Sequence, residues 1–217
     1  MAINSLQIGP QSSAGQRRRA AKLRHLAGAL ALAAASMSLA ACNHRDAAGA
    51  EAASRAPGGP FTLVDQDGRP VDQGVLNGKW SIVFFGYTYC PDFCPTTLTT
   101  LGKAMDALGP KAKDTQVVFI SVDPDRDTPA ELKTYLASRV FPKNIIGLTG
   151  SPDQVAAAAK AYMVFYQKQG IDKGYTVDHS TALYLMDPQG RFHGVIADGL
   201  TPQQDAQQIS AAMSGAA

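Results

Sequence analysis

The sequence predicts an α/β domain whose central sheet contains both parallel and antiparallel strands. Two continuous apolar runs, at 80–86 and 116–122, are typical of buried central strands. Apolar residues at helical spacing follow the first run over 95–108, and two further helices are expected at 129–140 and 152–162. Strands that alternate with helices in this way form parallel βαβ units.

Shorter segments complete the predicted sheet. The stretch FTLVDQDGRPV, residues 61–71, indicates two short strands around an Asp-Gly turn. The remaining expected elements are a strand at 145–148, an irregular hairpin at 163–177, a hairpin formed by 181–187 and 192–197, and a last helix from about Pro202. This order predicts a thioredoxin-like fold, with a central mixed sheet, flanking helices and an extra N-terminal β-hairpin.

Three of the predicted helices begin with the same signal. TPAE at 128–131, SPDQ at 151–154 and TPQQ at 201–204 each combine an N-cap hydroxyl, a proline and a Glu or Gln, which is a capping box. CPTT at 94–97 has the same proline placement, with Cys94 at the N-cap position. Because a helix N-terminus stabilises an anion, we expect the pKa of the Cys94 thiol to be lowered.

The N-terminal residues 1–41 are typical of a secretory signal, with a basic segment followed by the short apolar run 26–41. The run ends in LAAC, which resembles a bacterial lipobox and predicts lipidation of Cys42 after cleavage. Residues 42–59 are predicted to be a flexible tether and 60–217 the folded domain. Cleavage elsewhere, with Cys42 incidental, and an uncleaved span are the alternatives.

A lipidated, exported chain would lie on the periplasmic side of the bacterial inner membrane. The LAAC pattern does not distinguish the general secretory route from the twin-arginine route, although RRRAAK matches a twin-arginine signal poorly. The whole chain has 20 basic and 18 acidic residues, but the five charges of the leader are all basic. The remaining chain has a net charge of −3, so nothing in the charge balance indicates nucleic-acid binding.

Two cysteines, Cys90 and Cys94, lie close together behind the first buried strand. In an exported protein the pair could form a structural disulfide, a redox dithiol or a metal site. A disulfide Cys90–Cys94 would close a very small loop and add little stability, so a functional role is favoured. Two thiolates select a soft ion such as Cu(I).

A third metal ligand would have to come from a histidine. His25 would leave with the signal, His44 lies in the tether, and strand alternation directs His193 toward solvent. His179 lies in a loop that enters a buried strand. In thioredoxin folds this loop packs against the cysteine pair and usually carries a cis-proline, whereas here it reads Asp-His-Ser, so His179 is the candidate.

Three separated motifs, GYTYCPDFCP, SVDPDRDTP and DHSTALYLMDPQGRF, together resemble the Sco/SenC family of copper-binding proteins with a thioredoxin fold. The similarity extends from about Phe61 to the last helix. It implies that Cys90, Cys94 and His179 bind copper, and that the protein delivers copper to the copper A site of cytochrome c oxidase. Many members of the family carry His where Tyr89 stands here, which removes one accessory ligand.

A mainly acidic cluster follows the second buried strand at its C-terminal end, where α/β folds place ligands: Asp123, Asp125, Arg126 and Asp127. They could steer a partner, order the loop beside the metal or simply cap the next helix. Asp178 could orient the ring of His179 through its other nitrogen, or be a turn residue. Asp123 and Asp178 are therefore the predicted supporting residues.

Other side chains near the pair have simpler predicted roles. We expect the aromatic residues Tyr87, Tyr89 and Phe93 to shield the site from solvent. The methionines could bind Cu(I), but helical or strand spacing makes them core residues; these are Met105, Met163 and Met186.

Two functions remain in view. The first is a metallochaperone that binds Cu(I), with Cu(II) as a second state, and passes the copper on by ligand exchange. Its partners would be the copper-bearing subunit of cytochrome c oxidase, a thioredoxin-like reductant and other copper carriers. The second is enzymatic, a thiol-disulfide reductase in which Cys90 attacks and Cys94 resolves. His179 discriminates, since a reductase does not need it. A peroxidase is a weaker third hypothesis.

Overall fold

The computed structural model describes residues 56–170, 174–197 and 199–215. The predicted signal, the lipidation site Cys42 and the tether as far as residue 55 lie outside the described residues. The folded domain belongs to a compact unit that begins at Ala56. Within this unit the Gly58 N–H donates a hydrogen bond to the carbonyl oxygen of Ala161, at 3.0 Å.

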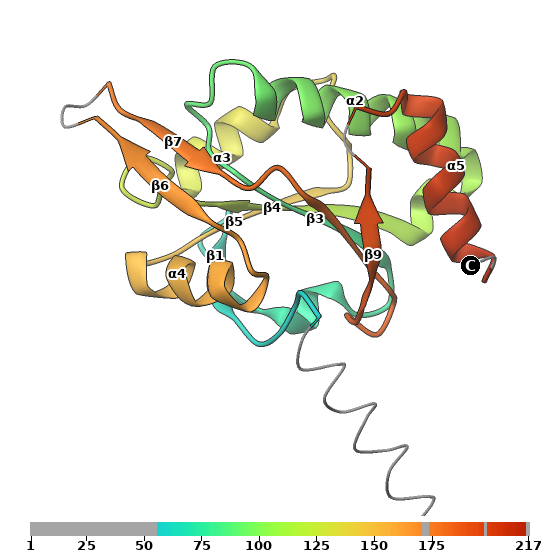
Figure 1. Ribbon diagram of the computed structural model, residues 1–217, viewed down its shortest axis with the longest axis horizontal. Coiled ribbons are helices and arrows are strands. Elements are labelled where there is room, and N and C mark those ends of the chain that lie inside the picture. The colour runs from blue at the N-terminus through green and yellow to red at the C-terminus, as the bar shows by residue number, and fades with distance from the viewer. Residues whose placement is uncertain (1–55, 171–173, 198, 216–217) are drawn as a thin grey trace, which may run out of the picture. The chain divides into compact units, whose positions relative to one another are not determined.

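The core of the domain is a seven-stranded sheet in the order β2-β1-β5-β4-β3-β8-β9 (Figure 1). Strands β3, β4 and β5 are parallel to one another, whereas β8 pairs antiparallel with β3 and β1 pairs antiparallel with β5. The predicted mixed sheet and the extra N-terminal hairpin are therefore confirmed. The strands are β1 (Thr62–Asp65), β2 (Pro70–Asp72), β3 (Trp80–Gly86), β4 (Thr115–Ser121), β5 (Ile145–Thr149), β8 (Leu183–Met186) and β9 (Phe192–Ile196).

Helices cover both faces of this sheet, and alternate residues of β3 separate the two cores. Ile82 and Phe84 face α2, α3 and α5, while Val83 and Phe85 face α4. Burial on both faces explains the uninterrupted apolar run of β3. The helices are α2 (Phe93–Leu108), α3 (Pro129–Leu136), α4 (Pro152–Ala161) and α5 (Pro202–Met213), with short 3₁₀ segments η1 (Gln73–Leu76) and η2 (Gly109–Asp114).

The helix starts follow the predicted capping signals in α3, α4 and α5. Ser151 and Thr201 form complete capping boxes, and the Thr128 side chain accepts a hydrogen bond from the Glu131 N–H. The helix expected over 129–140 ends early, at Leu136, because the chain turns to bury Phe141 ahead of Pro142. None of the described helices is long and apolar enough to cross a membrane.

A separate two-stranded hairpin, β6 (Tyr166–Gln169) and β7 (Thr176–His179), projects beside the sheet (Figure 1). Its position agrees with the irregular hairpin predicted at 163–177. The hairpin extends further than predicted, because Tyr166 pairs with His179. His179 is consequently held on a strand rather than in the loop that follows it.

Candidate metal centre

Three side chains from distant parts of the sequence meet beyond the C-terminal end of β3. The ligand atoms of Cys90, Cys94 and His179 all lie within 4.8 Å of one another. The Cys94 Sγ is 3.6 Å from the Nε2 of His179, and the Cys94 N–H donates a hydrogen bond to the Cys90 Sγ at 3.3 Å. The predicted trio therefore forms one cluster, with two sulfurs and one imidazole nitrogen available to a single ion.

The close approach of Cys94 to β3 depends on a glycine. Gly86 ends β3, and a Cβ built there would lie 2.9 Å from the Cys94 Sγ and 2.8 Å from the ring of Phe119. Contacts this short require something to move. Gly86 thus allows the buried sulfur to pack directly against the strand.

The predicted cap at Cys94 is wrong. The helix begins at Phe93 with Asp92 at its N-cap, so Cys94 is its second residue. Burial raises the pKa of the Cys94 thiol, although a hydrogen bond from the backbone of Tyr87 opposes the rise. The favourable helix end does not offset the lost hydration of a fully buried sulfur, so the expected lowering of this pKa is also wrong.

His179 is presented as a neutral ligand. Burial lowers the pKa of its ring, against the opposing effect of the Ser180 backbone. Its Nδ1 lies 2.9 Å from the Ser180 carbonyl oxygen, which can only accept a hydrogen bond. Nδ1 therefore carries the proton in the neutral ring, and the lone pair of Nε2 faces the sulfur of Cys94.

The carboxylate expected to orient this ring lies elsewhere. The Asp178 side chain accepts a hydrogen bond from the Gln169 amide at 2.8 Å across the hairpin, and the Ser180 carbonyl takes the predicted place beside His179. Alternation along β7 explains the difference, because neighbouring residues of a strand point to opposite faces.

Asp127, one of the acidic residues after β4, orders the cysteine loop, which is one of the roles left open by the sequence. Asp127 is buried and accepts hydrogen bonds from the Thr88 N–H at 3.0 Å, the Thr88 hydroxyl at 2.6 Å and the Ser121 hydroxyl at 2.6 Å. Burial raises the pKa of the Asp127 carboxyl even though these bonds oppose the shift. Asp127 therefore ties the loop that contains Cys90 to the end of β4.

Asp123 is also buried and connects two segments. Its carboxylate accepts hydrogen bonds from Arg126 Nε and from the Tyr175 hydroxyl, both at 2.5 Å. The predicted supporting role of Asp123 is thus indirect, through the hairpin that carries His179.

Arg126 was expected in the cluster that follows β4, but its contacts were not predicted. Its guanidinium lies 3.7 Å from the ring centre of Tyr175 and 4.6 Å from that of Tyr89, and it donates a hydrogen bond to the Tyr175 carbonyl oxygen at 3.0 Å. These cation–π contacts connect the cysteine loop to the β6–β7 hairpin. The only sequence signal for these contacts was the presence of tyrosines before and after SVDPDRDTP. The fold decides that Tyr89 and Tyr175 both reach Arg126.

The aromatic surroundings agree only partly with the prediction. Tyr87 is buried and Phe93 partly buried, with ring centres 5.9 Å and 6.4 Å from that of His179. Tyr89 is 57% exposed and covers Arg126 instead of the sulfurs. Phe84 completes the apolar wall at 6.4 Å from the imidazole.

The remaining predictions concern side chains away from the cluster. Met105 and Met186 are buried core residues as expected, whereas Met163 is 57% exposed and has a positive φ of 56°, so its predicted core role is wrong. His193 is exposed, as predicted, and packs edge-on against Trp80 with a centroid distance of 5.0 Å.

The fold and the cluster together define a class: a thioredoxin-like protein in which two free thiols and an imidazole converge where a cis-proline usually stands. The sequence model of the SCO1/SenC family matches residues 49–214. The chain belongs to the SCO1/SenC family.

Curated relatives and solved structures agree with this family assignment. The chain is 43% identical over 162 residues to protein SenC of Rhodobacter capsulatus, covering 74% of this chain and 72% of that protein. It is 44% identical over 146 residues to the mitochondrial protein SCO1 homolog 1 of Arabidopsis thaliana, covering 66% of this chain but only 43% of the plant protein. The structure of Bradyrhizobium japonicum ScoI with copper bound is similar, with a TM-score of 0.66, 43% identity and coverage of 71% and 98%.

A more distant solved structure is that of BsSco, with a TM-score of 0.55, 27% identity and coverage of 73% of this chain and 94% of that one. BsSco is a member of the Sco family of cytochrome c oxidase assembly proteins in which a disulfide switch has been identified.

Proposed function

We propose that this protein is a copper-binding metallochaperone that delivers copper to the copper A site of cytochrome c oxidase. The observation that carries the proposal is the convergence of Cys90, Cys94 and His179, with ligand atoms within 4.8 Å of one another. Two sulfurs and one imidazole nitrogen form a donor set that suits a soft ion such as Cu(I). The copper-bound ScoI of Bradyrhizobium japonicum supports the assignment of the metal.

The environment of the three ligands suits a cargo that must be held and then released. Cys94 is fully buried and its thiol must lose a proton on binding, so copper uptake releases protons. Cys90 is only partly buried and lies in the loop, where an incoming ligand can replace it first. The neutral imidazole of His179 completes a site for Cu(I), with Cu(II) as a second state.

The cellular setting is part of the same proposal. The basic and apolar leader 1–41 and the LAAC motif support export and lipidation at Cys42, which would hold the domain on the periplasmic side of the inner membrane. The proposed partners are the copper-bearing subunit of the oxidase, other copper carriers and a thioredoxin-like reductant that keeps the two thiols reduced.

A second function, thiol-disulfide reductase, is favoured by one contact. The Cys94 N–H donates a hydrogen bond to the Cys90 Sγ at 3.3 Å, which holds the sulfur of the more accessible cysteine, the one that would attack as a thiolate, close to Cys94. That thiolate would attack a disulfide in a partner and form a mixed disulfide. Cys94 would then form the Cys90–Cys94 disulfide and release two reduced thiols, and the external reductant would restore the pair.

Competition for Cu(I) separates the two functions. The domain from Ala56 onward, reduced and titrated against a chromophoric Cu(I) chelator, should bind one equivalent. His179→Ala removes one ligand and should weaken binding about 100-fold or more, judged against the 10–100-fold cost of losing a group that merely supports a ligand. The matched control is His193→Ala, because His193 is exposed and its ring faces Trp80.

The control should bind as the unmodified domain does. Cu(I) binding that is indifferent to His179 would overturn the copper-chaperone proposal and leave the cysteines as a redox pair.

A further inference from the structure

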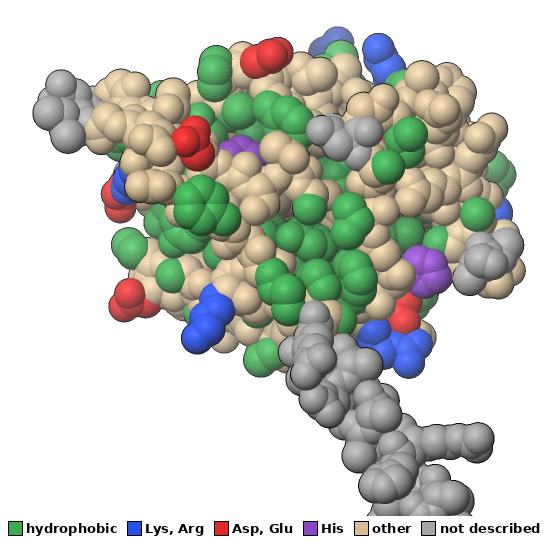
Figure 2. Space-filling view, viewed as in Figure 1, with side chains coloured by type: hydrophobic (Ala, Val, Ile, Leu, Met, Phe, Trp, Pro, Cys, Tyr) green, Lys and Arg blue, Asp and Glu red, His purple; other side chains and the backbone are tan. Residues whose placement is uncertain are grey.

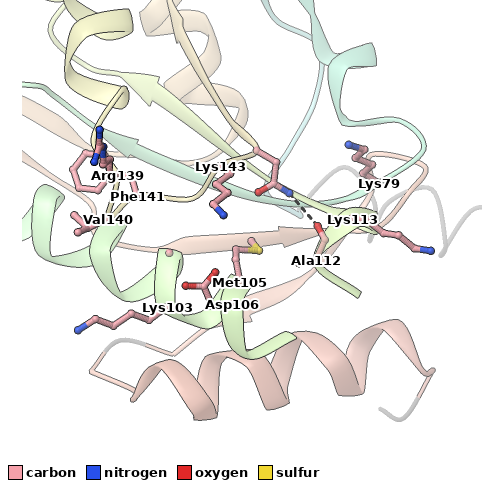
Figure 3. A pocket seen from close by; sticks show the side chains of 12 residues that line it. Lys79, Lys103, Met105, Asp106, Ala112, Lys113, Arg139, Val140, Phe141 and Lys143 are labelled. Atoms are coloured by element: carbon pink, nitrogen blue, oxygen red, sulfur yellow. Dashed lines mark hydrogen bonds between the residues drawn. The ribbon is translucent and has the colours of Figure 1, made fainter. Parts of the chain in front are cut away.

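A basic cleft lies between α2, η2 and the segment 139–144 (Figure 3). Its volume is about 490 Å³, and among the residues that the structure describes Asp106 is the one acidic side chain in its lining. Five cationic side chains surround it: Lys79, Lys103, Lys113, Arg139 and Lys143.

The concentration of cations is not a reflection of the overall charge. From residue 56 onward the chain has 13 basic and 16 acidic residues, so more than a third of the basic residues surround one cleft in an acidic domain. In the described part of the chain, none of these five cations forms an ion pair with a carboxylate. Their charges are therefore available to an anion from outside.

The cleft lies at the opposite end of the sheet from the metal centre. Lys79, Lys113 and Lys143 each stand within two residues before one of the parallel strands β3, β4 and β5, whereas the cysteine loop follows the C-terminal end of β3. A strand of seven residues such as β3 is about 23 Å long. A surface bound at the cleft would therefore leave the metal centre uncovered.

The rim of the cleft also exposes an apolar side chain. Val140 is 56% exposed between Arg139 and the buried Phe141. On the face shown in Figure 2, by contrast, hydrophobic side chains gather in the middle and charges of both signs lie around the margin. Cations around an exposed aliphatic residue are typical of surfaces that dock on a membrane interface.

We propose that this end of the domain docks on an anionic lipid surface, with the basic cleft receiving phosphate headgroups. The charge of the cleft and the chain ahead of Ala56 both favour a lipid surface as the occupant. If Cys42 carries a lipid, as proposed above, the 14 residues to Ala56 span at most about 50 Å, so the domain is always near the bilayer. The inference rests on that anchoring for proximity and not on copper binding.

Docking in this way also orients the metal centre. Asp92 and Asp178, near the cysteine loop and on the hairpin, are exposed acidic residues that an anionic surface repels. Attraction at one end of the sheet and repulsion at the other direct Cys90 and His179 away from the membrane, where a protein partner can reach them.

The chain contains its own reporter for the test. Trp80 is the only tryptophan in the sequence, is partly buried and directly follows Lys79. The domain from Ala56 onward, which has its own core, is mixed with vesicles of equal parts phosphatidylcholine and phosphatidylglycerol, or of phosphatidylcholine alone. We expect cosedimentation with the anionic vesicles that weakens as salt rises, and quenching of Trp80 by lipids spin-labelled near the headgroup.

Paired variants assign the binding to the cleft. Each cation near an anionic surface strengthens binding about fivefold, so Lys103→Gln with Lys143→Gln should weaken it about 25-fold. The control, Arg69→Gln with Lys133→Gln, removes the same charge from exposed residues outside this cleft and should bind as the unmodified domain does.

Three results would overturn the proposal: no binding to the anionic vesicles at low salt, equal loss in both pairs of variants, or Trp80 that is not quenched in the bound state. Cleft-dependent binding of soluble polyglutamate, with none to vesicles, would also overturn it and assign the cleft to an acidic peptide. Cu(I) binding by the same variants should be unchanged, so failure of this inference is distinct from failure of the copper site.

Discussion

Replacement of Gly86 by alanine tests whether the packing behind Cys94 sets the metal centre. The added Cβ would lie 2.8 Å from the Phe119 ring and 2.9 Å from the Cys94 Sγ, both well inside ordinary contact distance. Overpacking of this kind costs about 1–3 kcal/mol of unfolding free energy. We expect a loss of about 2 kcal/mol, which for a domain of this size lowers the Tm by about 4–8 °C.

The same substitution should weaken copper binding. Cys94 cannot withdraw into a fully buried core, so its sulfur has to move toward the cavity that the three ligands share, and misplaced donor atoms bind less tightly. We expect about a tenfold loss of Cu(I) affinity, on the scale of disturbed groups that support metal ligands. Urea denaturation measures the first effect and chelator competition the second.

Gly194 provides the matched control. It lies in β9, and a Cβ added there would meet nothing within 4 Å, so Gly194→Ala should leave both the urea midpoint and the Cu(I) affinity close to their original values. A Gly86→Ala variant with an unchanged midpoint and affinity would refute the reasoning. A reduced midpoint with unchanged affinity would mean that Phe119 moves and Cys94 does not.

Two further predictions concern buried charges. Arg126→Ala removes the guanidinium from the buried Asp123 and should lower the unfolding free energy by about 3 kcal/mol in urea denaturation, whereas an unchanged midpoint would show that Tyr175 and Lys168 satisfy the carboxylate without it. Burial raises the pKa of Asp205 from 3.8 to about 6, so its contribution to stability is present below pH 4 and is lost as the pH rises through 6. Asp205→Asn should therefore stabilise the domain by about 1 kcal/mol at pH 8 and not at pH 4, and an equal effect at both pH values would exclude the carboxyl as the cause.

The sequence predicted the sheet well because its strongest signals are local. The runs that became β3 and β4 are buried on both faces, and a strand of that kind has an apolar side chain at nearly every position. The capping signals of α4 and α5 are equally local, since the residues that form each box lie within four positions. Met163 was misplaced because spacing alone does not reveal that the chain turns there with a positive φ.

The site divides in the same way between local and distant information. His179 could be chosen from the sequence because the topology of the fold brings the segment ahead of β8 to the cysteine pair, although His179 itself ends β7. The cation–π contacts of Arg126 with Tyr89 and Tyr175 could not be predicted. The two tyrosines are 37 and 49 residues away from Arg126 in the sequence, and the contacts depend on side-chain direction.

Cys94 is the most instructive error, because the local argument was sound in kind and wrong in magnitude. A thiolate in the first turn of a helix gains about 0.3–1 kcal/mol from the helix dipole at an exposed site. Removing that charge from water into a fully buried position costs several times more, and the pKa rises. A buried thiol with a raised pKa is a poor nucleophile at neutral pH, but a metal ion can displace its proton and remain attached. Burial therefore makes Cys94 less reactive than predicted. It favours a role for Cys94 as a metal ligand over a role as the thiol that initiates exchange.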